Sequence, residues 1–268
     1  MKRRVIGSVT LGLLAVTAIT VVANNITQDL PFAQDWTNVG LITTNDDWNT
    51  PGVPGVIGYL GDSDPAGTVT AVDPRTLTAD VPVAIDVVAQ HVTSNTSGGV
   101  GEFELGNPTI GMQGSGTADA PYIKLHVNTA KKANIVISYN VRDIDGTLDN
   151  SVQQCVAQYR VGSSGAWTNI ASTYVADATT GPSLATLVTP VTGTLGTDAD
   201  RQAAPVEIRI MTTNAASNDE WIGIDDITVT GSEPAVPGSQ PFVLVLLAAL
   251  IAGTAVWTFR SKTAADRT

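Results

Sequence analysis

Apolar and polar residues alternate along several segments of the chain. Apolar side chains recur at every second position within 123–127, 135–141, 155–161 and 206–210, with mostly polar or charged residues between them. This period of two is typical of a β-strand that buries one face and exposes the other to water. The pattern predicts strands with one buried face and one wet face.

No segment between residues 30 and 232 shows a helical period, and clusters of glycine, proline, asparagine and aspartate separate the alternating runs. Many short strands joined by turns favour two antiparallel sheets packed face to face. We therefore predict an all-β, jelly-roll-like antiparallel β-sandwich over residues 24–232.

The two ends of the chain have the character of membrane addresses. Residues 1–23 join a basic start to an apolar stretch with small residues before Asn24, which predicts a secretory signal peptide. An uncleaved N-terminal anchor is the alternative. Residues 242–259 carry no charge and are long enough for a transmembrane helix. They follow a proline-rich linker at 233–241.

Residues 260–268 form a basic tail, which the positive-inside rule places in the cytoplasm. The sequence thus predicts an exported protein that is anchored at the cell surface by its C-terminal helix, with its domain outside. The tail resembles the PEP-CTERM sorting signals read by exosortases, although Glu233-Pro234-Ala235-Val236-Pro237 stands where those signals have an intact Pro-Glu-Pro. The resemblance implies a sorting transpeptidase as a possible partner, and because the motif departs from those signals, retention as a simple membrane anchor is the default interpretation.

The charge of the chain is strongly negative and unevenly placed. The net charge is −11, and residues 24–232 hold 23 acidic and 8 basic side chains, a net of −15. Such a surface repels phosphates, so nucleic-acid binding by charge is excluded, whereas cations are attracted. Cys155 is the one cysteine, so no internal disulfide forms. Its position in an apolar run predicts a buried thiol, with an intermolecular disulfide as the alternative.

Several stretches of the predicted sandwich resemble a bacterial extracellular domain found near the N-terminus of large secreted nucleases and phosphatases of the endonuclease/exonuclease/phosphatase type. The resemblance covers nearly all of residues 35–230 and is carried by segments 46–48, 55–59, 139–146, 158–162, 177–182, 211–214 and 219–227. It implies a jelly-roll-like accessory or adhesive module without nuclease activity. Segment 224–227 also resembles the last strand of carbohydrate-binding jelly rolls.

An acidic turn offers oxygen ligands at close spacing. Asp143, Asp145 and Asp149 surround Gly146, and calcium prefers six to eight oxygen ligands, so this turn is a candidate calcium site although its spacing is not that of an EF-hand. The alternative is a turn whose carboxylates cap backbone amides.

The last alternating run breaks its register. Ile222 and Ile224 place Asp226 on the apolar face, but the apolar series resumes at Ile227. This break predicts a β-bulge, or an inward carboxylate that meets a cation or an arginine. The candidate protein partners are Arg142 and Arg209. Similarity to jelly rolls that tie their first strands to their last with structural calcium implies that Asp46 or Asp47 joins Asp226.

Aromatic and imidazole side chains give weaker signals. Trp167 follows a glycine-serine turn, so we expect it to be exposed and able to stack on a sugar ring. Core packing is the expectation for Trp36, Trp48 and Trp221. His91 and His126 have no second ligand at zinc spacing.

The function that these signals favour is a non-enzymatic cell-surface module. It would bind a polysaccharide or another surface component, or build the surface layer. The alternative is an extracellular hydrolase that uses the acidic cluster near the last strand, formed by Asp219, Glu220, Asp225 and Asp226.

Overall fold

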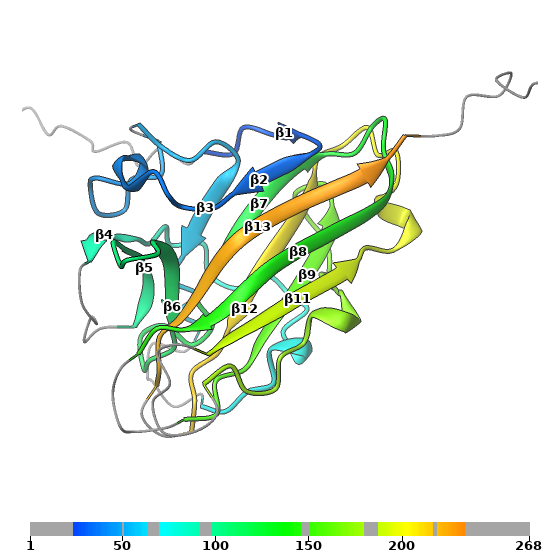
Figure 1. The fold of residues 1–268 in the computed structure, drawn as a ribbon. Helices are drawn as coiled ribbons and strands as arrows, with labels where there is room; N and C mark the ends of the chain where they lie inside the picture. Colours follow the sequence, from blue (N-terminus) through cyan, green and yellow to red (C-terminus); the bar gives the residue numbers. More distant parts are fainter. Residues whose placement is uncertain are drawn as a thin grey trace, which may run out of the picture.

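A computed structural model describes residues 24–49, 51–63, 70–91, 98–145, 151–179, 187–216 and 219–233. Two sheets pack face to face in it (Figure 1). The prediction of an all-β two-sheet sandwich is therefore confirmed. The predicted signal peptide, transmembrane helix and basic tail, and all of the linker except Glu233, lie outside the described residues. No helix among the described residues is long and apolar enough to cross a membrane.

Sheet A has six strands, and β7 and β12 lie at its centre. Its main path runs β1 (Gln28–Asp29), β7 (Tyr122–Asn128), β12 (Val206–Thr212), β9 (Cys155–Val161) and β10 (Thr168–Asn169), and β3 (Val56–Tyr59) also pairs with β7. The pairs are antiparallel except for β1 with β7.

Sheet B has seven strands, and its longest members are β8 and β13. Its main path runs β11 (Val188–Thr194), β8 (Ala133–Asp143), β13 (Ile222–Ser232), β6 (Thr109–Gln113), β5 (Gly99–Phe103) and β4 (Val88–His91), and β2 (Phe32–Gln34) also pairs with β13. Here β4 runs parallel to β5, so the sandwich is mainly rather than wholly antiparallel. Short 3-10 turns lie at Val39–Leu41, Pro74–Thr76 (η2), Ala171–Thr173 and Thr197–Ala199.

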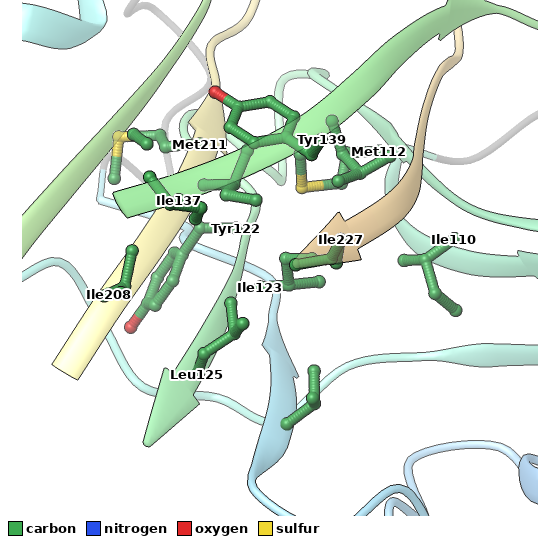
Figure 2. Close-up of a cluster of buried hydrophobic side chains, with 14 of the residues drawn as sticks. Ile110, Met112, Tyr122, Ile123, Leu125, Ile137, Tyr139, Ile208, Met211 and Ile227 are labelled. Atoms are coloured by element: carbon green, nitrogen blue, oxygen red, sulfur yellow. The ribbon is translucent and has the colours of Figure 1, made fainter. Parts of the chain in front are cut away.

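The core fills the space between the sheets (Figure 2). Inward positions alternate along each strand, as with Ile123 and Leu125 on β7 facing Ile137 and Ile227 of sheet B. Cys155 is fully buried in this layer, as its apolar setting predicts. Burial raises the pKa of its thiol to about 12, so the thiol is inert.

Candidate functional site

The outer face of sheet A is covered by a segment that we call the strap, residues 71–80. Polar side chains on the strands hold its backbone. Arg209 on β12 donates to the carbonyl oxygens of Leu77 and, at 3.3 Å, of Ala79. Gln158 on β9 donates to the Pro74 carbonyl at 3.4 Å. The Pro74 carbonyl also accepts from the Leu77 amide at 3.2 Å, so polar side chains of β9 and β12 add to the bonds that hold the strap backbone.

The strap overturns the prediction of a wet face on these strands. The alternation is present, but β7, β9 and β12 are buried at nearly every position. Lys124 and His126 on β7 are only 9% and 6% exposed, and Arg209 on β12 is fully buried. The alternation predicts solvated side chains at Gln158 and Arg209, and the strap that covers them has no periodic signature of its own.

Beyond the strap, the outer face of sheet A opens into a cleft of about 610 Å³. Its walls come from β3, β7, β9, β12 and the end of the strap. It is lined by Asn25, Ile57, Tyr59, Asp80, Val81, Pro82, Val83, Lys124, His126, Arg160, Ser163 and Glu207. Charged groups of both signs and apolar side chains therefore share one concave surface.

Glu207 lies at the centre of the cleft floor. The sheet places it directly between His126 on β7 and Arg160 on β9. Its Oε1 lies 3.2 Å from Lys124 Nζ and 3.3 Å from His126 Nε2, and its Oε2 accepts from Arg160 Nε at 2.7 Å. Arg160 Nη1 in turn donates to Asp80 Oδ1 at 2.6 Å. The floor is thus a connected, fixed set of donors and acceptors.

The surroundings keep Glu207 ionised. Burial alone would raise the pKa of this carboxyl, but the hydrogen bonds from His126 and Arg160 and the charge of Lys124 lower it to about 2. The ring of Tyr59 lies beside the floor, 5.2 Å from Lys124 Nζ and stacked on Tyr122 at 4.8 Å. Burial and the charge of Glu207 raise the pKa of Tyr59 to about 12.

The expectation that Trp167 is exposed is wrong. Its side chain is 3% exposed, and the guanidinium groups of Arg160 and Arg209 each lie 4.3 Å from its ring centroid. Its indole nitrogen donates to Asp80 Oδ1 at 3.0 Å. Cations thus cover the ring and the strap holds its edge, which leaves no face for a sugar. Trp36, Trp48 and Trp221 are buried, as predicted.

The bulge predicted at Asp226 is present. The pairing of β13 with β8 shifts register between Asp225 and Thr228, and Asp226 has a φ of 51°. The buried carboxylate is however Asp225, at 1% exposure, which pairs with Arg142 at 2.8 Å. Asp226 is exposed and accepts from Asn140 at 2.8 Å. The bulge turns the side chain of Asp226 to the surface and leaves that of Asp225 inside.

The predicted calcium ligands lie in different places. Asp46 is exposed and accepts from the Val87 backbone at 3.2 Å, apart from the Asn140 contact of Asp226. Asp143 and Asp145 are both buried, and the Asp145 amide donates to Asp143 Oδ1 at 3.1 Å. Asp149 lies outside the described residues. Within the described ranges no three histidine, cysteine or acidic side chains are grouped to hold a metal ion.

The carboxylates of the hydrolase alternative form hydrogen bonds or an ion pair within the protein. Asp219 accepts from the Ala215 amide at 2.6 Å, and Glu220 from the Ser151 amide at 3.1 Å. Asp225 is held by Arg142, so the side chains face backbone and arginine groups. The alternation predicts only wet strand positions at Lys124, Arg160 and Glu207, and for His126 it adds no more than a histidine without a second zinc ligand. Opposite charges on neighbouring alternating strands are the signal that could have drawn attention to them.

No known protein family matches the sequence, and no curated protein matches it. Solved structures give distant likenesses. One structure comes from work on the promiscuous specificity of carbohydrate-binding modules of the β-sandwich superfamily. It matches with a TM-score of 0.32 and 12% identity, covering 46% of this chain and 47% of that one. The chain therefore spans about half the length of this first structure.

Two further likenesses come from different kinds of protein. A carbohydrate-binding module specific for non-crystalline cellulose has a TM-score of 0.36 and 10% identity, covering 52% of this chain and 84% of that one. A Stig cyclase from Fischerella sp. TAU has a TM-score of 0.38 and 13% identity, covering 76% of this chain and all of the other. The chain, a β-sandwich by its own two sheets, has distant similarity to binding modules and to an enzyme, a similarity of architecture alone.

Proposed function

We propose that the protein is a non-enzymatic binding module that holds a glycan in the cleft on the outer face of sheet A. The observation that carries the proposal is the connected floor of Lys124, Glu207 and Arg160. Each of these side chains is fixed by a partner, so a ligand meets donors and acceptors that are already ordered. Preorganisation of this kind reduces the entropy lost on binding.

The cleft also suits a glycan in size and in character. Its volume of about 610 Å³ lies within the usual range of ligand sites. Ile57, Tyr59 and Val81 supply an apolar wall beside the charged floor. A sugar ring has hydroxyls at its edge and C–H groups on its faces, so it can use both surfaces at once.

Obstruction of the cleft tests the proposal with little risk to folding. Ser163 lines the cleft and is exposed, while its neighbour Ser164 is exposed and does not line it. The full chain should bind members of a glycan array, and Ser163→Arg should weaken that binding by about tenfold or more. Ser164→Arg, the matched control, should bind within about twofold of the unchanged chain. Equal binding by all three proteins would place any glycan elsewhere.

Removal of a floor donor gives a second readout. Lys124→Met keeps Glu207 paired with Arg160 and His126 but removes the ammonium group, so the titrated affinity should fall by about tenfold. Lys132→Met removes an ammonium that pairs with Glu233 instead, and affinity should be unchanged. The hydrolase alternative predicts that the full chain releases reducing ends from a bound glycan, whereas the binding module leaves it intact.

The setting of the domain completes the proposal. We propose export by the 1–23 signal, display by the helix at 242–259, and a jelly-roll-type domain outside the cell, with the tail a substrate for a sorting transpeptidase or a plain membrane anchor. In that setting the cleft would meet surface polysaccharide. Protease treatment of intact cells should digest the domain, and protection would contradict the orientation.

A further inference from the structure

The charges in the cleft balance one another. Lys124 and Arg160 are its cations and Asp80 and Glu207 its anions, and every cation pairs with at least one of the anions. With histidine counted as neutral, the lining has no net charge. This balance stands out in a region that holds 23 acidic and 8 basic residues.

We infer, on the basis of the proposed glycan-binding function, that the cleft selects neutral glycans over anionic ones. No lysine or arginine of the lining is left over to neutralise a carboxylate or sulfate on the ligand. An anionic sugar would lie beside Glu207, which stays ionised at all ordinary pH values, and would first pass Asp80, whose side chain is 56% exposed. Both carboxylates repel an anion, as does the overall charge of the domain.

A cationic ligand is disfavoured because the two cations of the cleft lie at its central carboxylate. Lys124 Nζ and the Arg160 guanidinium both lie at Glu207, so an ammonium group would approach that carboxylate only next to like charges. Neighbouring hydroxyls of a neutral sugar fit better, because each hydroxyl both donates and accepts a hydrogen bond. One hydroxyl can accept from Lys124 while the next donates to Glu207.

A paired glycan panel tests the inference. The full chain is titrated with neutral hexose oligosaccharides of several configurations and with the corresponding uronate oligosaccharides, at about 150 mM salt to suppress non-specific attraction. We expect at least one neutral ligand to bind about tenfold or more tightly than its uronate counterpart. Equal or tighter binding of uronates would overturn the inference and leave the binding function standing. Binding of neither set would overturn both.

A change of one charge makes the test a gain of function. Asp80→Asn gives the lining a net positive charge at an exposed position, so uronate binding should strengthen by about twofold to tenfold. Asp35→Asn removes the same charge at an exposed residue outside the cleft and should leave the neutral-to-uronate ratio unchanged. An unchanged ratio in Asp80→Asn, or an equal gain in the control, would show that the charge balance of the cleft does not set selectivity.

Discussion

The outer faces of the two sheets carry similar alternating sequences but lie in different surroundings. On sheet B, β8 alternates between buried and more exposed positions along its length, and the second half of β13 does the same. On sheet A, β7, β9 and β12 are buried on both faces. On β9 and β12 the strap makes the difference, since its backbone uses their outward polar side chains as hydrogen-bond partners.

The surroundings of a polar strand position decide its role. On an open face it is solvated, and its substitution should matter little. Under a covering segment the same residue type becomes a structural donor or part of a fixed charged network. A binding surface then needs only a gap in the cover, as where the strap ends at Asp80 and the cleft begins.

The largest expected contrast is between Glu207 and Asp226. Glu207→Gln leaves Lys124 and Arg160 without their shared carboxylate on the buried face, so the free energy of unfolding should fall by about 3 kcal/mol. Asp226→Asn makes the same chemical change at an exposed bulge and should stay within about 0.5 kcal/mol. Urea unfolding followed by tryptophan fluorescence measures both, and similar losses would contradict the contrast.

A second contrast isolates the strap. Arg209→Met removes a fully buried donor to the Leu77 and Ala79 carbonyls, so stability should fall by about 2 kcal/mol. Thr230→Met places the same side chain at an exposed position of β13, with an expected change of about 0.5 kcal/mol or less. Proteolysis should also cut the strap faster in Arg209→Met alone. Protection equal to that of the control would mean that other contacts hold the strap.

Much of the fold could be predicted from the sequence because its strands follow a simple period. The alternating runs at 123–127, 135–141, 155–161 and 206–210 all lie within strands of the structure. The bulge at Asp226 was predictable as well, because the apolar register slips there by one residue. These features depend on local pattern, which a sequence carries directly.

The candidate site was not predictable in the same way. Glu207 meets His126 and Arg160 only because β12 lies between β7 and β9, and strand order is not written in the period of any one strand. Trp167 follows a glycine-serine turn that favours exposure, yet two arginines from other strands enclose it. The covering strap has no repeating pattern, so the burial it causes had no local signal.

The two sheets should also respond to pH with opposite signs. The pKa of Glu207 is lowered from 4.5 to about 2, so its stabilisation is present above pH 4.5 and is lost as the pH falls toward 2. On β5 of sheet B, burial and the charge of Glu104 raise the pKa of Glu102 from 4.5 to about 7. The folded state then favours the protonated form, so stability falls as the pH rises from 4.5 through 7.

Unfolding midpoints between pH 3 and 8 test this opposition. We expect a maximum near pH 4 to 5. Glu102→Gln should flatten the fall on the alkaline side and leave the acid side steep, while Glu207→Gln should do the reverse. A profile that neither variant reshapes would assign the pH dependence to other groups, among them Asp86, whose pKa burial raises to about 6.

The smallest expected effect concerns the calcium that the sequence predicts. On sheet A each carboxylate of the cleft has a cationic partner. Near the end of β8 the situation differs: burial raises the pKa of Glu220, and the nearby charges of Asp143 and Asp145 raise it further. The candidate calcium site at this turn also includes Asp149, which lies outside the described residues, so calcium binding here stays a prediction. If the site has the weak affinity of extracellular modules, about 10 mM calcium should raise the free energy of unfolding by about 1 kcal/mol over a chelator. Asp143→Asn should abolish the shift and Asp80→Asn should retain it, since only the first removes a carboxylate from this end of sheet B. A shift that persists in Asp143→Asn would place the calcium elsewhere, and no shift in the unchanged chain would mean that these carboxylates are held by protein contacts alone.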